Sequence, residues 1–158
     1  MVQGYNHPIN QIIADLDELI THEYEVGATA TPALMLPGTA VIFDTVDGSV
    51  KEAGAEADNF LGVLDVQMDS AITHPYAVGE QCRVIEHGKC MVRFPAGGTG
   101  VTPGLPIITG ANGLFAAQAV GLQGEQGAPV GYALETNAHA AADFVLVMIT
   151  GQREASTT

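Results

Sequence analysis

Residues 82–94 read CRVIEHGKCMVRF, two runs rich in β-forming residues on either side of His87-Gly88. A two-residue loop that ends in glycine is typical of a β-hairpin, because a type I′ turn needs a positive φ at both central residues. We therefore predict a hairpin in which Glu86 lies opposite Lys89. Each face of this hairpin is about half apolar, which fits a strand pair in a small barrel or sandwich with one side buried.

The rest of the chain repeats this rhythm of short apolar run and glycine turn, which is typical of an all-β protein. We expect one small β-barrel or sandwich of short strands over residues 23–150, followed by a polar tail over residues 151–158. The predicted strands outside the central hairpin span residues 23–31, 39–45, 49–53, 60–68, 105–109, 113–117, 130–135 and 143–150. A chain of 158 residues is long enough for a substantial core in one domain.

Residues 1–22 follow a different pattern, which predicts an N-terminal arm and one short amphipathic helix. The arm covers residues 1–7, and Pro8 suits the first turn of a helix. Helical spacing then places six apolar residues on one stripe: Ile9, Ile12, Ile13, Leu16, Leu19 and Ile20. A helix this short is marginal alone, so its stripe must dock, either on its own barrel or on a partner.

The formal charge of −13, with only five Lys and Arg residues, bounds the possible partners. No basic stripe could track phosphates, so we expect no nucleic acid and no anionic membrane as a partner. Such acidity has two ordinary explanations, solubility through self-repulsion or adaptation to a halophilic host, and both remain open.

The two cysteines are expected to be buried and reduced. In the predicted hairpin Cys82 and Cys90 are offset by about three residues and point to opposite faces, which excludes a disulfide. No basic segment of the signal-peptide type opens the chain. The longest apolar run, Phe144–Ile149, is too short to span a bilayer.

No residue pattern predicts catalysis, a metal or a cofactor. The cysteines sit where small buried residues belong, and the five histidines lack metal-ligand spacing. Residues 97–100 read GGTG, but the Lys-Ser/Thr and helix of a phosphate-binding loop do not follow. We therefore expect a protein that is not an enzyme.

The turn and strand order resembles that of the small capsid-decoration proteins of tailed viruses, also called head-stabilising or cement proteins. The resemblance covers about residues 23–150 and rests on a Pro-Gly turn, a strand, an Asp-Gly turn, a strand and a later strand with an apolar-Gly-Val sequence. The segments that carry it are Pro37–Asp44, Asp47–Ala53, Leu61–Asp65, Tyr76–Glu80, Val101–Pro106 and Gly131–Glu135.

This resemblance implies a β-barrel on the outer surface of an icosahedral head, commonly a homotrimer, that clamps neighbouring major capsid subunits. It supplies no catalytic residues, and the predicted N-terminal helix departs from the bare barrel of the family. Our candidates for contact with the shell or a sibling subunit are Tyr5, Pro8, Ile9, Ile12, Leu16 and Leu19. The alternative is another virion β-barrel, a tail or spike module with ligand or receptor binding. Its sign would be an exposed aromatic cluster drawn from Tyr24, Tyr76, Phe115 and Tyr132.

Overall fold

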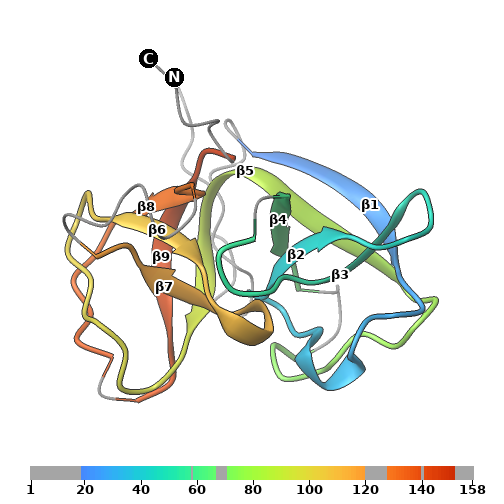
Figure 1. Cartoon of the computed structure of the whole chain (residues 1–158), viewed down its shortest axis with the longest axis horizontal. Helices are drawn as coiled ribbons and strands as arrows, with labels where there is room; N and C mark the ends of the chain where they lie inside the picture. The colour runs from blue at the N-terminus through green and yellow to red at the C-terminus, as the bar shows by residue number, and fades with distance from the viewer. Residues whose placement is uncertain (1–18, 58, 67–70, 120–127, 140, 152–158) are drawn as a thin grey trace.

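A computed structural model describes residues 19–57, 59–66, 71–119, 128–139 and 141–151, and Figure 1 shows their path. The predicted all-β class is confirmed. The strands are β1 (Ile20–Val26), β2 (Ala40–Phe43), β3 (Ser49–Glu52), β4 (Phe60–Leu64), β5 (Gln81–Phe94), β6 (Pro106–Thr109), β7 (Phe115–Ala117), β8 (Gly131–Ala133) and β9 (Asp143–Ile149). Two short 3-10 turns, η1 (Pro32–Leu34) and η2 (Ala111–Gly113), lie between them.

Five strands close into a small barrel, which forms the right half of the molecule in Figure 1. Strand β1 pairs in parallel with β3, and antiparallel pairs then run from β3 to β2, from β2 to β4 and from β4 to β5. The ring closes because β5 also pairs with β1, where Tyr24 lies opposite Cys82. Closure leaves no free edge between these strands.

The central stretch is one strand of 14 residues, so the predicted hairpin at His87-Gly88 is wrong. Its first half pairs with β1 and β4 in the barrel, whereas the residues from Gly88 onward pair with β9. Gly88 does have the positive φ that its position implied, 123°. That φ lies within a continuing strand, and Gly88 pairs with Ile149 instead of closing a turn. The predicted pair of Glu86 with Lys89 does not exist.

The second half of the molecule is a sheet in which β9, β8, β6 and β7 follow β5 in order. The hairpin predicted around residues 110–112 is confirmed, since β6 and β7 pair antiparallel across η2. Asn112 takes a left-handed φ of 58° there, a conformation that asparagine tolerates better than most residues. Strand β5 therefore belongs to both halves and joins them rigidly.

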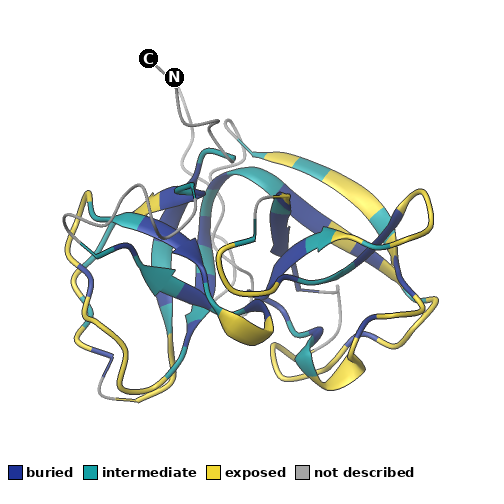
Figure 2. Ribbon diagram, viewed as in Figure 1, coloured by how far each residue is buried: buried dark blue, intermediate teal, exposed yellow. Residues whose placement is uncertain are grey.

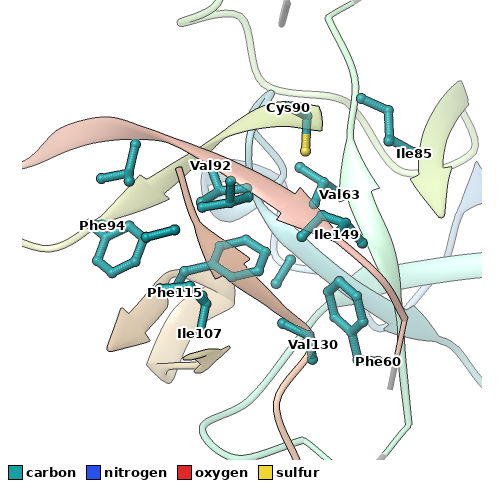
Figure 3. Close-up of a cluster of buried hydrophobic side chains, with 14 of the residues drawn as sticks. Phe60, Val63, Ile85, Cys90, Val92, Phe94, Ile107, Phe115, Val130 and Ile149 are labelled. Carbon is teal, nitrogen blue, oxygen red and sulfur yellow. The ribbon is translucent and has the colours of Figure 1, made fainter. Parts of the chain in front are cut away.

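Two hydrophobic clusters fill the fold. The first lies inside the barrel and contains Val26, Ala30, Met35, Val41, Val50, Leu64, Tyr76, Cys82 and Val84. The second lies between the outside of the barrel and the second sheet, and Figure 3 shows Val63, Ile85, Cys90 and Phe115 within it. Neighbouring barrel residues such as Val63 and Leu64 therefore enter different clusters, because side chains alternate along a strand. Figure 2 shows buried positions on strands of both halves and exposed positions mainly in the loops and along β1.

The strand boundaries differ most from prediction at the N-terminus. Strand β1 begins at Ile20, not at residue 23, because residues 20–25 pair with β5. Ile20 therefore cannot be the last residue of a helix, and that end of the predicted helix is wrong. Residues 1–18 lie outside the described chain, as do residues 152–158 of the predicted tail.

The two cysteines are free and buried, as predicted, although the predicted register is wrong. They lie eight residues apart on one strand, about 26 Å along an extended chain, and this separation prevents a disulfide. Cys82 packs inside the barrel and Cys90 packs between the barrel and the second sheet.

Candidate interaction surface

The predicted contact residues end beside the protein's own core. Leu19, the last of them, is partly buried and packs against the cluster between the two halves. The next residue, Ile20, is 51% exposed at the start of β1. The other five candidates, Tyr5, Pro8, Ile9, Ile12 and Leu16, lie outside the described residues.

One end of the barrel carries a hydrogen-bonded group that the sequence did not reveal. His22 Nδ1 lies 3.0 Å from Glu86 Oε2, and the Tyr24 hydroxyl donates to Glu86 Oε1 over 2.5 Å. His22 and Tyr24 lie opposite the interior residues Val84 and Cys82, so this group continues the barrel interior towards solvent. We call this open end the barrel mouth. The wrong hairpin register hid it, because Glu86 was expected to face Lys89.

The barrel mouth does not combine a base with a reactive nucleophile. A histidine beside a carboxylate is one element of nucleophilic catalysis, but here the carboxylate of Glu86 also holds a tyrosine. Burial, followed by the hydrogen bond to Glu86, raises the pKa of Tyr24 to about 12. Burial likewise raises the pKa of the nearby Cys82 thiol to about 12, so the thiolate needed for attack is scarce at neutral pH.

Apolar side chains are exposed beside the same mouth. The rings of Tyr24 and Phe43 meet edge to face with centroids 5.8 Å apart. Phe43 is 49% exposed, and Val46, in the turn between β2 and β3, is 64% exposed. We call Tyr24, Phe43 and Val46 the mouth patch. Phe43 lies on the same side of β2 as the interior residue Val41, so the alternation of side chains along the strand would by itself bury the Phe43 ring. The ring is exposed because the barrel opens at this end.

The turn that carries Val46 is fixed by the carboxylate of Asp44. One oxygen accepts from the Thr29 backbone N–H at 3.0 Å, and the other accepts from the Thr29 hydroxyl at 2.5 Å and the Thr45 N–H at 2.8 Å. Lys51 Nζ lies 3.7 Å away. The Asp44 side chain is only 1% exposed. Hydrogen bonds from the Thr29 side chain and backbone hold the pKa of Asp44 at about 2, below its usual value.

Backbone hydrogen bonds also hold the turn against its neighbours. The Val46 carbonyl accepts from the Ser49 N–H at 3.0 Å and from the Ser49 hydroxyl at 2.5 Å. The Glu25 N–H donates to the Gly48 carbonyl over 3.0 Å, which ties the turn to β1. The exposed side chain of Val46 therefore stands on a rigid support.

A shallow hollow of about 280 Å³ lies between β1 and this turn. Its lining includes Tyr24 and Val46 together with the acids Glu23, Glu25 and Asp47. Within the part of the chain that the structure describes, no cation pairs with these three carboxylates. The hollow is therefore both apolar and negatively charged.

Three of the chain's cations are engaged elsewhere. Lys51 lies beside Asp44 and donates to the Thr29 hydroxyl, while Arg83 binds the buried carboxylate of Asp65. Arg93 donates to the carbonyls of Pro37 and Ile72 and lies 4.6 Å from the centroid of the Phe144 ring. These contacts fasten loops to the fold, and none of them is a salt bridge to a carboxylate of the hollow, although Arg83 lies opposite Glu23 in the β1–β5 ladder.

The four aromatic residues expected to mark a receptor-binding surface do not form a cluster. Tyr76 and Phe115 are buried at 2% and 0% exposure, whereas Tyr132 is 38% exposed in the second sheet. Among the described residues, no group of three or more His, Cys, Asp and Glu side chains could hold a metal ion. The same residues include no helix long and apolar enough to cross a membrane.

The chain is similar to a known protein family and to a solved structure. Residues 11–150 match the model of a family described as XM1 gp53 minor capsid protein. The crystal structure of the N base of head fiber gp8.5 in bacteriophage phi29 has a TM-score of 0.50 at 13% sequence identity, over 87% of this chain and 99% of that chain. At that identity the likeness shows the fold alone. No curated protein sequence matches the chain.

Proposed function

Because this chain belongs to the XM1 gp53 minor capsid protein family, we propose that it is a decoration protein that acts without catalysis. It binds the outside of an icosahedral head and clamps neighbouring major capsid subunits. The observation that carries this proposal is the family match, which spans both halves of the fold. Membership already makes the chain a capsid-associated structural protein of the virion; the outer position and the clamping are what we propose.

The rigid two-part fold supports a clamping role. Strand β5 runs through both halves, and the cluster between them buries both Val63 of the barrel and Val147 of the second sheet. Such a body cannot hinge easily between its halves, so contacts with two different subunits would resist their separation. Many weak contacts repeated over a shell add up through avidity and stabilise it against expansion or disruption.

The charge supports an outer position. A protein with a formal charge of −13 remains solvated on the outside of a head and repels the packaged nucleic acid within it. The major capsid protein is the partner that this position implies, and neither nucleic acid nor membrane is proposed as a partner.

We also propose which residues contact the shell and which oligomer the protein forms. We assign the contact with the shell or a sibling subunit to Tyr5, Pro8, Ile9, Ile12, Leu16 and Leu19, and the assembled form to a homotrimer. Leu19 already packs on the protein's own core, so the segment leaves the body next to the cluster between the halves. We propose that the apolar stripe predicted on this segment continues the contact onto a neighbour.

The test uses heads purified from a phage mutant that lacks this chain. Full-length protein should bind these heads at a regular site in cryo-EM maps and raise their temperature of disruption. A variant without residues 1–18, which leaves β1 intact, should fold normally but bind more weakly. Absence of the full-length protein from the outer surface of wild-type heads would overturn the proposal. Light scattering should find a trimer in solution, or the cryo-EM maps should show one on the heads.

A second candidate is a base module for a fibre, spike or tail component. The fold shared with the phi29 head fiber base favours it, although fold alone does not determine function. The same maps separate the two candidates. A decoration protein covers the lattice between subunits, whereas a fibre base carries further density that projects from it.

A further inference from the structure

We propose that the mouth patch is a second surface, in addition to the N-terminal residues, by which this protein binds the major capsid subunit, and that its occupant is a segment of that subunit with an apolar side chain flanked by Lys or Arg. This inference rests on the proposed decoration function and adds the contact surface and the chemistry of the partner. It concerns residues of β1, of β2 and of the turn between β2 and β3, which are not among the N-terminal contact residues.

The apolar part of the patch is continuous and pre-formed. Tyr24 and Phe43 are in ring contact, and Tyr24 and Val46 line the same hollow. A single exposed apolar residue is ordinary on a protein surface, but adjoining ones on a concave surface are typical of an interaction site.

The rigidity of the mouth patch favours the binding of a partner. Asp44 and Ser49 fix the turn on both sides of Val46, and the Tyr24 hydroxyl is held by Glu86. An exposed apolar side chain on a mobile loop must lose conformational entropy when a partner binds. One on a fixed turn loses little, so more of its burial contributes to affinity.

The surrounding charge identifies the chemistry of the occupant. Among the described residues, none of the three lining carboxylates Glu23, Glu25 and Asp47 is in a salt bridge, and Arg83 opposite Glu23 is paired with Asp65, so the carboxylates attract a basic segment. The apolar residues require an apolar side chain between those cations. A Lys- or Arg-flanked apolar segment satisfies both requirements at once.

A second copy of this chain fits the patch poorly. Its formal charge of −13 would bring like charges together at the hollow. Lys51, Arg83 and Arg93 of a second copy are already bound to its own acceptors. The shell subunit is therefore the occupant that the charges favour.

The experiment measures binding of purified protein to heads from the mutant that lacks it, at low and high salt. Val46→Asp should weaken binding at least about tenfold, since it places a charge in the apolar contact. The combined variant Glu23→Gln, Glu25→Gln, Asp47→Asn should bind about 5- to 30-fold more weakly at low salt and equally well at high salt, where screening removes the attraction. Circular dichroism and thermal unfolding should be unchanged for both.

Matched controls lie away from the mouth. Tyr132→Asp changes an exposed apolar residue of the second sheet, and Glu56→Gln removes an exposed carboxylate outside the hollow; both should bind like the wild type. Wild-type affinity in folded Val46→Asp protein would overturn the inference. A loss of trimer without a loss of head binding would overturn it too, by making a second copy the occupant. Failure of the wild-type protein to bind heads would instead refute the decoration function itself.

Discussion

The carboxylate of Asp44 lies against the backbone of Gly27, in the space that any larger residue would fill. A Cβ at position 27 would overlap Asp44 Oδ2 and fall 2.6 Å from the Cβ and Cγ of Asp44. Gly27 therefore lets the carboxylate reach Thr29 and close the turn that carries the mouth patch. The requirement is steric, because Gly27 has no left-handed φ.

Gly27→Ala should destabilise the protein by about 2–3 kcal/mol, because the whole carboxylate must move and lose hydrogen bonds to a charged group. Urea unfolding at pH 7 measures the change. Gly54→Ala is the matched control, since a Cβ there meets nothing within 4 Å. Equal stability of the two variants would mean that the turn adapts without cost. A destabilised Gly27→Ala protein should also bind heads more weakly.

Asp44 gives the protein an acid-sensitive contact. Its pKa is about 2 in the folded protein, against 3.8 for an unperturbed aspartate, so folding favours its ionised form. The stability that it contributes is present above about pH 4 and is lost as the pH falls through about 2. Unfolding free energies measured from pH 5 to pH 2 should therefore fall less steeply for Asp44→Asn than for the wild type.

The buried carboxylate of Asp65 depends on Arg83. The Asp65 residue is only 4% exposed, and Arg83 Nε donates to its Oδ2 over 2.6 Å. Burial raises the pKa of Asp65, and the charge of Arg83 partly opposes that rise. Removal of Arg83 therefore leaves an ionised group in the interior without its cation.

Arg83→Met should destabilise the fold by about 3 kcal/mol at pH 7. This value is at the lower end of the range for the loss of one partner of a buried ion pair, because the arginine side chain is half exposed. The deficit should shrink as the pH falls towards 4, since a raised pKa favours the protonated carboxyl in the folded state. Chemical unfolding at both pH values measures this. A deficit independent of pH would point to lost packing of the arginine stem instead.

Sequence patterns predicted most strands but not their joint arrangement. The apolar run Ala40–Phe43 and the turn at Gly48 were sufficient to identify the hairpin of β2 and β3. Val63-Leu64 and Val84-Ile85 gave a continuous apolar signal, because one member of each pair fills the barrel and the other faces the second sheet. From sequence alone, such a run indicates a buried strand but does not show which hydrophobic cluster each side chain enters.

The candidate surface was less predictable than the fold. The mouth patch unites Tyr24 and Phe43, residues from β1 and β2, two strands that do not pair with each other in the sheet. The sequence instead predicted a contact surface at the N-terminus. Helical periodicity can be recognised within a short segment, whereas contacts between strands that are distant in sequence cannot. The one local sequence signal for this surface was Val46, an apolar residue within the predicted Val46–Gly48 turn.

The two thiols should be inert in the native protein. Burial raises the pKa of both Cys82 and Cys90. Iodoacetamide at pH 8 should therefore label neither cysteine in native protein and both in urea. The variant Cys82→Ser, Cys90→Ser should lose about 1–3 kcal/mol of stability for each buried hydroxyl and bind heads normally. Rapid native labelling, or lost binding by the folded variant, would assign a function to a thiol.

Gly88 provides the test of the continuous central strand. Its φ of 123° lies in a region that L-residues rarely adopt, at the point where β5 passes from the barrel to the second sheet. Gly88→Ala should cost about 1–3 kcal/mol as backbone strain, more than Gly54→Ala. The loss should appear as one cooperative transition in thermal unfolding, since both halves share β5. Two separate transitions would show that the halves fold independently, and they would remove the rigid connection on which the proposed clamp depends.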